Sequence, residues 1–218
     1  MHVFSCGPMS YRNDRGKTLL NRIILRFEAP HLAVITGDSG CGKTTLLKAV
    51  AGLNKADVME RMIDGETFSL RRLPEWRSKV TLSPQDAPVI DGSVEDNLLF
   101  PYAFRNAGRP EPERVVLSMY LKRVGLGYVN LDANVSELSG GERHRLCLVR
   151  AILWEPFVLL ADEPFSGIEQ ALAMRCFALV REFVESGPRI AICTTHDELL
   201  AQQADSVWRL EDGRLHRA

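Results

Sequence analysis

Long hydrophobic runs are absent from this sequence of 218 residues. The longest, such as residues 157–161, hold only a few apolar side chains, whereas a segment that spans a bilayer needs about 20. We therefore expect no transmembrane helix. The first residues also lack a basic segment followed by an apolar stretch, so we expect no secretion signal.

Paired cysteines are lacking as well. The cysteines are odd in number, widely scattered and without a C-x-x-C pair, and they stand at positions 6, 41, 147, 176 and 193. This spacing argues against a disulfide framework and against a structural zinc site. We expect a protein of the reducing cytoplasm, which could serve a membrane only through another chain.

An excess of charge of either sign is also missing, because 27 lysines and arginines face 28 aspartates and glutamates, for a net charge of −1. Whole-protein electrostatics therefore offers no argument for a nucleic-acid partner, and none is expected. Apolar residues make up 45% and charged residues 25% of the chain, as is typical of globular proteins. No repeat, low-complexity tract or linker divides the sequence, so we predict a single domain over residues 1–218.

Short apolar segments alternate along the chain with helical patterns. Strands are predicted by alternating apolar positions at 23, 25 and 27, by the runs 31–36, 157–161 and 189–194, and by a hairpin pattern at 207–216. Helices are predicted at 43 to about 53, 110 to about 124, 139 to about 154, and 169–184. This order indicates an α/β fold with a mostly parallel sheet. The proline-rich residues from about 86 to 138 are long enough to form a helical subdomain.

A glycine-rich loop stands between the apolar run 31–36 and a helical pattern. It fits G-x-x-x-x-G-K-[ST] and consists of Gly37, Asp38, Ser39, Gly40, Cys41, Gly42, Lys43, Thr44 and Thr45. Glycines let the backbone wrap closely around phosphates with its N–H groups pointing inward. We predict that Lys43 reaches the β- and γ-phosphates of a nucleoside triphosphate and that Thr44 places its hydroxyl on Mg²⁺. Alone, the loop indicates only nucleoside triphosphate binding, because kinases, GTPases and motor ATPases share it.

Residues 54–57 spell Asn-Lys-Ala-Asp, the N-K-x-D pattern that reads guanine in small GTPases. The pattern begins 54 − 43 = 11 residues after Lys43. At about 1.5 Å per helical residue, that distance is roughly 16 Å along the helix axis. We therefore expect a helix end pointing away from the phosphates, and no guanine pocket.

A second phosphate cradle is predicted at Leu138-Ser139-Gly140-Gly141-Glu142, because N–H groups at a helix N-terminus favour anions. One nucleotide cannot need both cradles in one chain. At this point the sequence resembles the ATP-binding subunits of ABC (ATP-binding cassette) transporters, whose signature motif is LSGGQ or LSGGE. The resemblance covers essentially the whole chain. It implies a P-loop NTPase (RecA-like) core with a mostly parallel sheet, an N-terminal antiparallel β subdomain and an inserted α-helical subdomain.

The resemblance also implies catalytic roles. Asp162 and Glu163 look like the family's Walker B motif, in which the first holds Mg²⁺ and the second orients and deprotonates the attacking water. His196 matches the switch histidine that contacts the γ-phosphate. Gln85 matches the glutamine that senses Mg²⁺ and the attacking water and links the site to a transmembrane partner. The implied catalytic residues are Lys43, Gln85, Glu163 and His196, and the implied metal ligands are Thr44, Gln85 and Asp162.

Two further positions follow from the resemblance. Tyr11 stands where the family has an aromatic that stacks on adenine, with Phe4 as a nearby competitor. Residues 166–169 align with the D-loop, where Glu169 replaces the usual aspartate and leaves the contact across the dimer open. The implied ATP-binding residues are thus Tyr11, the loop residues 37–45, Ser139, Gly140 and Gly141.

In this family two subunits pair head to tail and clamp each ATP between the loop of one and the signature of the other. The resemblance therefore implies ATP and Mg²⁺ as cofactors, a second ATP-binding subunit and an integral-membrane permease as partners, and a place on the inner face of the cell membrane. Residues 89–101 are expected either near the surface that grips the permease or in the core of the helical subdomain.

The transported cargo is only hinted at. Residues 96–101, followed by Arg105 and Asn106, are similar to the bacterial iron-export ATPases, so metal export is our cargo hypothesis. The alternatives are transport of another small substrate and a soluble, non-transport ATPase of the same superfamily, in DNA repair, chromosome organisation or translation. A single phosphate loop, a single signature and the lack of sustained heptads disfavour the non-transport class.

Overall fold

The computed structural model describes residues 1–104 and 108–218, and its larger sheet has six strands in the order β11-β10-β3-β9-β8-β7. These strands are β3 (His31–Thr36), β7 (Val80–Ser83), β8 (Val158–Ala161), β9 (Ile190–Thr194), β10 (Ser206–Glu211) and β11 (Arg214–Arg217). Neighbouring strands are parallel except for the β10–β11 hairpin. The predicted α/β fold with a mostly parallel sheet is confirmed.

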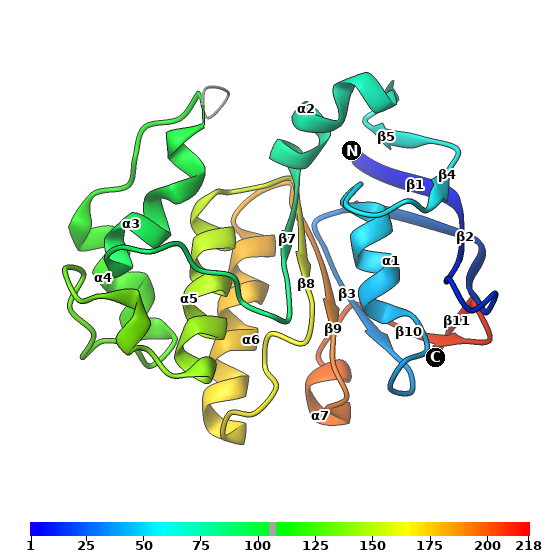
Figure 1. Ribbon diagram of the computed structural model, residues 1–218. Helices are drawn as coiled ribbons and strands as arrows, with labels where there is room; N and C mark the ends of the chain where they lie inside the picture. The colour runs from blue at the N-terminus through cyan, green and yellow to red at the C-terminus, as the bar shows by residue number, and fades with distance from the viewer. Residues whose placement is uncertain (105–107) are drawn as a thin grey trace.

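Strand β3 separates two hydrophobic cores. Leu32 and Val34 pack on one face of the sheet, where α5 (Gly140–Leu153) and α6 (Gln170–Glu185) lie (Figure 1). Ala33 and Ile35 pack on the other face, against α1 (Lys43–Val50). A strand covered on both faces has no polar side, which is why it reads as a continuous apolar run in the sequence.

A smaller antiparallel sheet lies beyond α1 (Figure 1). It consists of β1 (His2–Arg12), β2 (Thr18–Ala29), β4 (Asp57–Val58), β5 (Arg61–Ile63) and β6 (Glu66–Thr67). In β2 the side chains of Ile23, Leu25 and Phe27 are buried, as their alternation predicted. The antiparallel N-terminal subdomain that the family resemblance implied is therefore present.

Between β7 and α5, the described residues form short helical elements. These are α3 (Val94–Leu99), a 3-10 turn at Phe100–Ala103, α4 (Arg114–Arg123) and a 3-10 turn at Val135–Glu137. Val94 and Leu98 are fully buried in the core shared with α5, whereas Pro101 lines a surface cavity. Residues 89–101 thus contribute Val94, Asn97 and Leu98 to the buried interior, while the rest of the segment is half-buried or exposed. The bounds 86–138 for a subdomain stay a prediction, and residues 105 and 106 of the iron-export resemblance lie outside the described residues.

Two helices are shorter than predicted, for local reasons. Helix α1 ends at Val50 because Gly52 adopts a left-handed conformation (φ +69°) and the chain turns there. Helix α4 begins at Arg114 because Pro110 and Pro112 disfavour helical backbone in the residues before them. The other two predicted helices, α5 and α6, agree with prediction to within a residue at each end.

The cysteines belong mainly to the cores. Cys6, Cys147, Cys176 and Cys193 are buried and unpaired, and burial raises the pKa of each thiol, for Cys6 and Cys193 to about 12. Buried thiols with a raised pKa are unreactive. Cys41, in the phosphate loop, is half-buried.

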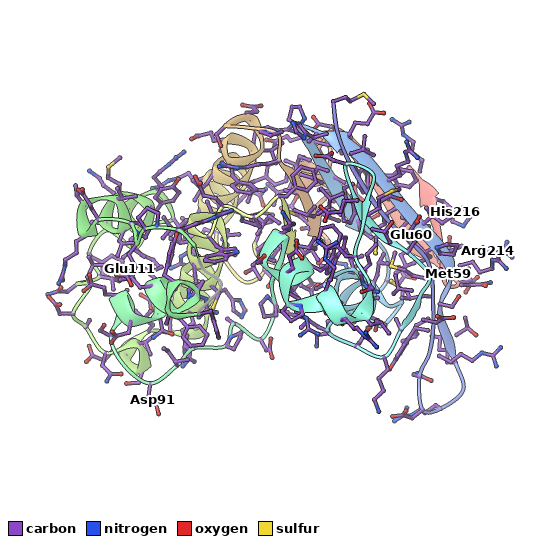
Figure 2. All side chains as sticks on the ribbon, turned by 90° about the horizontal axis from the view of Figure 1, so that it is seen from above. Met59, Glu60, Asp91, Glu111, Arg214 and His216 are labelled. Atoms are coloured by element: carbon purple, nitrogen blue, oxygen red, sulfur yellow. The ribbon has the colours of Figure 1, made fainter. Side chains whose placement is uncertain are left out.

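The chain is elongated, with its helical part at one end and the antiparallel sheet at the other (Figure 1). Seen from above, Asp91 and Glu111 mark the helical end, and Met59 and Arg214 mark the opposite end (Figure 2). In the part of the chain that the structure describes, no helix is both long and apolar enough to cross a membrane. Short helices α2 (Leu73–Lys79) and α7 (Glu198–Ala201) complete the fold.

Candidate active site

The glycine-rich loop joins β3 to α1, and each of its three glycines has a positive φ that other residues adopt only with strain. Gly37 has φ +144°, and a Cβ there would lie 2.5 Å from the carbonyl oxygen of Leu210. Gly42 has φ +116° and caps α1, and a Cβ there would lie 3.1 Å from the carbonyl oxygen of Leu19. The first turn of α1 carries no acidic side chain that would compete with an anion. The predicted order of strand, glycine loop and helix is present.

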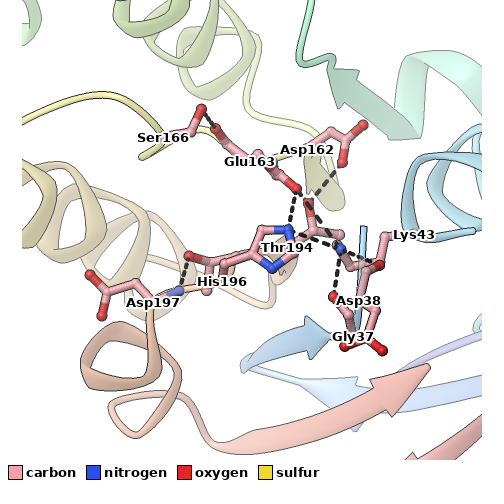
Figure 3. A network of polar contacts seen from close by, with 10 residues as sticks. Gly37, Asp38, Lys43, Asp162, Glu163, Ser166, Thr194, His196 and Asp197 are labelled. Carbon is pink, nitrogen blue, oxygen red and sulfur yellow. Dashed lines mark hydrogen bonds and ion pairs between the residues drawn. The ribbon is translucent and has the colours of Figure 1, made fainter. Parts of the chain in front are cut away.

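Lys43 is buried, with 6% of its surface exposed, and acceptors surround its ammonium group. Nζ donates to the carbonyl oxygens of Gly37 at 2.8 Å and Asp38 at 3.2 Å. It also lies 3.2 Å from Nε2 of His196 and 3.9 Å from Oε1 of Glu163 (Figure 3). The chain therefore brings together three side chains that were predicted separately, from three different loops.

Asp162 and Glu163 follow β8 directly, and a threonine of β9 ties them together. Oγ1 of Thr194 donates to Oδ1 of Asp162 at 2.8 Å and accepts the N–H of Glu163 at 2.8 Å (Figure 3). Asp162 is 2% exposed and Thr194 is fully buried. This threonine holds the two acidic residues in a fixed relation to the end of β9.

The backbone of Glu163 is strained, because its φ of +48° lies in the left-handed region that side chains with a Cβ disfavour. Such a conformation costs about 1–3 kcal/mol and persists only where its surroundings enforce it. Here Thr194 accepts the N–H of Glu163, and the carbonyl of Glu163 accepts from both the N–H and the hydroxyl of Ser166. Hydrogen bonds on both sides of the residue therefore aim its carboxylate.

His196 stands on the loop between β9 and α7, with Nε2 2.9 Å from Oε1 of Glu163. When Nε2 carries a hydrogen it donates to Glu163, because an ionised carboxylate can only accept; when it does not, it can accept from Lys43. The next residue, Asp197, caps α7 by accepting two backbone N–H groups. His196 is half exposed and so remains accessible to a ligand.

The three predicted metal ligands, Thr44, Gln85 and Asp162, line one cavity of about 330 Å³. They offer hydroxyl, amide and carboxylate oxygens, which are the donors that Mg²⁺ prefers. Among the described residues, no group of three His, Cys, Asp or Glu side chains could hold a metal by itself. The residues therefore fit a Mg²⁺ ion that completes its shell with water or phosphate oxygens.

The signature forms a separate cradle at the start of α5. Ser139 accepts the N–H of Glu142 through Oγ at 3.4 Å, and the Glu142 carboxylate accepts the N–H of Ser139 at 2.6 Å. A Cβ on Gly141 would lie 3.8 Å from Ile168 of the D-loop, whereas one on Gly140 would meet open space. Within the described residues, no hydrogen bond or ion pair joins this cradle to Lys43.

The two aromatic candidates for adenine stacking occupy different places. Phe4 is fully buried and stacks on Trp76 with ring centroids 5.8 Å apart, so it belongs to the core. Tyr11 is half-buried at the end of β1, opposite Leu20. A cavity of about 500 Å³ adjoins the loop, and its described lining includes Lys17 and not Tyr11. Stacking by Tyr11 stays a prediction.

Two expectations about loop ends can now be compared with the structure. The chain after α1 does not extend away from the helix: the amide of Asn54 donates to the carbonyl of Thr45, in the first turn, at 2.9 Å, and accepts the N–H of Ala56. The estimate of 16 Å was therefore wrong. The nitrogen and the oxygen of the Asn54 amide are nevertheless both used in hydrogen bonds within the chain. Glu169 is exposed at the N-cap of α6 without a capping hydrogen bond, so its role across a dimer stays a prediction.

Sequence reasoning missed Thr194 and Ser166, which hold Glu163 in place. A threonine two residues before His196 was the only signal for Thr194, and a threonine at the end of a buried strand is common. Ser166 was noted only as part of the D-loop. The Thr194 contact joins residues 31 apart, which no local pattern encodes, whereas the Ser166 contact reaches back only 3 residues and depends on the turn that the chain makes there.

Comparisons with known proteins agree on one family. Residues 16–166 match the family model described as "ABC transporter". The chain is 33% identical over 193 residues to "Probable iron export ATP-binding protein FetA" of Escherichia coli, covering 88% of this chain and 84% of that protein. It is 30% identical over 227 residues to "Lipoprotein-releasing system ATP-binding protein LolD" of Francisella tularensis, covering 98% and 95%. It is 31% identical over 208 residues to "Cell division ATP-binding protein FtsE" of Escherichia coli, covering 92% and 91%.

Solved structures agree in fold. A bacterial Atm1-family ABC exporter with ATP bound superimposes with a TM-score of 0.82 at 22% identity, over 99% of this chain and 38% of that one. The chain thus spans little more than a third of that exporter. CbiO1 from Clostridium perfringens, part of the ABC transporter complex cbiONQ, superimposes with a TM-score of 0.77 at 23% identity, over 98% and 86%. Taken with the site and the sequence relatives, these findings show that the chain belongs to the ABC transporter family, as an ATP-binding subunit whose activity is ATP hydrolysis coupled to transport.

Proposed function

We propose that two copies of this chain clamp two molecules of MgATP between them and that their hydrolysis drives a separate membrane permease. The observation that carries the proposal is the meeting of Lys43, Glu163 and His196 at the end of the phosphate loop. The signature cradle of the same chain lies apart from this point. A second subunit is therefore needed, so that the signature cradle of one subunit reaches the ATP held by the loop of the other.

In this proposal each side chain has a distinct task. Lys43 exchanges one of its carbonyl contacts for phosphate oxygens and neutralises their charge. Glu163 orients the attacking water and accepts its proton, with its backbone held by Thr194. His196, next to Glu163, contacts the γ-phosphate and holds the carboxylate in place.

The metal fits the same scheme. Thr44, Gln85 and Asp162 would hold Mg²⁺, which when bound neutralises charge on the phosphates. Thr194 donates a hydrogen bond to Asp162, which keeps that carboxylate oriented.

A surface cavity of about 730 Å³ is the place where we propose that the permease docks. It lies between α2, α5 and the edge of β7, and its lining includes Arg77, Thr81, Ser83, Arg150 and Trp154. Gln85, in the metal cavity, stands two residues beyond Ser83, and the Ser83 carbonyl accepts the N–H of Asp162 at 2.9 Å. A permease segment bound here would therefore touch the strand that leads directly into the site.

For the cargo, we propose metal export, with the chain at the cytoplasmic face of the cell membrane. The support is the 33% identity to a protein described as a probable iron exporter, together with the similarity of residues 96–101. The relatives described as acting in lipoprotein release and cell division are 30% and 31% identical, so they define the competing cargo or task.

The docking proposal is tested by placing a photo-cross-linking amino acid at Ser78, which lines the cavity, in a Glu163→Gln chain in native membranes. The matched control carries the same group at Ser118, an exposed position of α4. We expect a multi-span membrane protein to be cross-linked from position 78 and not from 118. Equal cross-linking from both positions would overturn the docking place, and capture of soluble proteins or nucleic acid only would overturn the proposed membrane permease partner.

The cargo is tested in cells that carry Lys43→Ala in place of the native residue. Export of iron predicts that their iron content, measured by mass spectrometry, rises above that of cells with the native chain. Unchanged iron together with retained lipoproteins at the inner membrane would replace metal export by lipoprotein release.

A further inference from the structure

Glu142, the last residue of the signature, is held by two groups from different loops. Its Oε2 accepts the backbone N–H of Ser139 at 2.6 Å, and its Oε1 is bound by the hydroxyl of Tyr128. The Ser139 side chain first, the Tyr128 hydroxyl second and the Ser139 N–H third lower the pKa of Glu142 to about 2. The carboxylate is therefore ionised at neutral pH, at the mouth of a cradle built for anions.

Tyr128 reaches this carboxylate from a short, well-anchored loop after α4. Leu126 is fully buried and donates its N–H to the carbonyl of Leu121, and Val129 donates its N–H to the carbonyl of Leu126. Gly125 makes the turn with φ +74°. The loop thus holds Tyr128 at its tip, where 73% of the side chain is exposed, and the aromatic ring contributes little to the core.

A buried cation lies close to the same carboxylate. Arg145, one turn further along α5, is 8% exposed, and its Nε has no acceptor within the described residues. Its positive charge acts on both Glu142 and Tyr128. Glu142 therefore has a hydroxyl donor on one oxygen, a backbone donor on the other and an arginine beside it.

This arrangement determines what the signature offers to a phosphate. Oγ of Ser139 accepts the N–H of Glu142 at 3.4 Å, and the Ser139 side chain also acts on the Glu142 carboxylate, so both are held together at the start of α5. A carboxylate that swung toward an incoming phosphate oxygen would repel it. An acidic side chain at this position is therefore compatible with phosphate binding only if it is held in place, as Glu142 is.

We propose that Tyr128 is a positioning residue for the signature: by binding Oε1 of Glu142, it holds that carboxylate on Ser139 and away from the phosphate oxygens of the partner subunit's nucleotide. The inference rests on the proposed function, because it needs an ATP sandwiched between two copies. It concerns the second subunit's ATP, so it leaves binding of ATP by the chain's own loop unaffected.

The test compares ATP-driven dimerisation of Glu163→Gln with that of the double variant Glu163→Gln, Tyr128→Phe, by analytical ultracentrifugation with saturating MgATP. Removing a hydrogen bond to an ionised but exposed acceptor should weaken dimerisation roughly 3- to 10-fold for each Tyr128 lost. Tyr120→Phe, which removes a hydroxyl from α4, is the matched control and should leave dimerisation unchanged. Affinity of the monomer for a fluorescent ATP analogue should be equal in all variants.

A second comparison asks whether Tyr128 acts through Glu142. In the same background, Tyr128→Phe added to Glu142→Ala should weaken dimerisation no further than Glu142→Ala alone. Additive losses, an unchanged dimer with Tyr128→Phe, or a parallel loss of monomer ATP affinity would each overturn the inference while leaving the ATP sandwich intact. Failure of the parent Glu163→Gln chain to dimerise with MgATP would overturn the sandwich itself, and the inference with it.

Discussion

Glu163 is the residue on which hydrolysis should depend most directly. Glu163→Gln keeps the shape of the side chain and removes the base, so we expect ATP turnover to fall about 10²- to 10⁴-fold. Nucleotide affinity should be retained, because Lys43 and the loop are untouched and one negative charge near the phosphates is gone. Phosphate release and binding of a fluorescent nucleotide measure the two effects.

The control for this change is Glu155→Gln, an exposed glutamate that pairs with Arg189 on the surface. Its turnover should match that of the native chain. Turnover by Glu163→Gln within tenfold of the native rate would contradict the assignment of Glu163 as the base.

Thr194 offers a sharper test of how the strained residue is held. Thr194→Val preserves the shape but leaves the Glu163 N–H and one Asp162 oxygen without a partner. We expect turnover to fall about 10- to 100-fold, as is usual when a group that orients a metal ligand is lost, and stability to fall by about 1–3 kcal/mol. Steady-state kinetics and urea unfolding measure these changes.

Two variants bracket the Thr194 prediction. Thr194→Ser keeps the hydroxyl and should recover most of the activity, whereas Thr81→Val removes a half-buried strand hydroxyl that donates only to the Arg77 carbonyl. If Thr194→Val were as active as Thr81→Val, the hydroxyl would have no part in aiming Glu163.

At the scale of the elements, caps and buried amides determine where segments begin. Asn97 of α3 is fully buried, and its amide accepts the N–H of Ile90 while donating to the carbonyls of Ile90 and Ser93. It therefore pins the loop before α3 to the helix, 7 residues apart in sequence. The structure thus assigns this asparagine a structural task.

Asn97→Ala should destabilise the chain by about 3 kcal/mol, because the fully buried amide of Asn97 is lost and the N–H and carbonyl of half-buried Ile90 lose their partner. Urea unfolding followed by circular dichroism measures the change. Asn130→Ala, which removes an exposed turn amide that accepts the Asp132 N–H, should shift stability by about 0.5 kcal/mol or less. Similar losses at both positions would show that the loop before α3 is not held by Asn97.

At the scale of the whole molecule, His31 connects the two sheets. Its ring stacks on Phe27 of β2, with centroids 5.0 Å apart, and its Nε2 lies 2.8 Å from Oγ of Ser206 in β10. Burial lowers the pKa of His31, with Arg181 and Arg217 acting in the same direction and Asp205 against it. Folding therefore favours the neutral imidazole.

The sign of the pH effect follows from this shift. Above the ordinary pKa of about 6.5 both states hold a neutral His31, and stability is unaffected. As pH falls below that value, the unfolded state takes up a proton before the folded state does, so stability decreases. The lowered pKa of Asp205 contributes only near its own ordinary value of 3.8, well below this window.

We therefore expect the free energy of unfolding, measured in urea, to be lower at pH 5.5 than at pH 7.5. His31→Gln keeps an acceptor for the Ser206 hydroxyl and cannot titrate, so its stability should fall less over the same range. An equal fall in the native chain and in His31→Gln would assign the pH dependence to other groups.

The sequence by itself determined what depends on local backbone and on periodicity. The glycine loop 37–45 requires left-handed φ at Gly37 and Gly42, and Ser139 caps a helix through its own third neighbour. Strands such as β3 are apolar throughout because both faces are covered. These features are encoded within a dozen residues, so the α/β fold and the position of Lys43 could be predicted, whereas the role of Glu163 was implied by the family resemblance.

Only the tertiary structure decided which distant groups meet. The two-residue strands β4 and β6 exist because neighbouring strands pair with them. Two residues are too few to show an alternation of apolar and polar side chains. Phe4 and Tyr11 look alike in sequence, yet packing buries the first and leaves the second at a sheet end. The Thr194 link to Glu163 joins residues 31 apart. Such contacts depend on how whole elements pack together, and the side-chain pattern along one segment does not specify that packing.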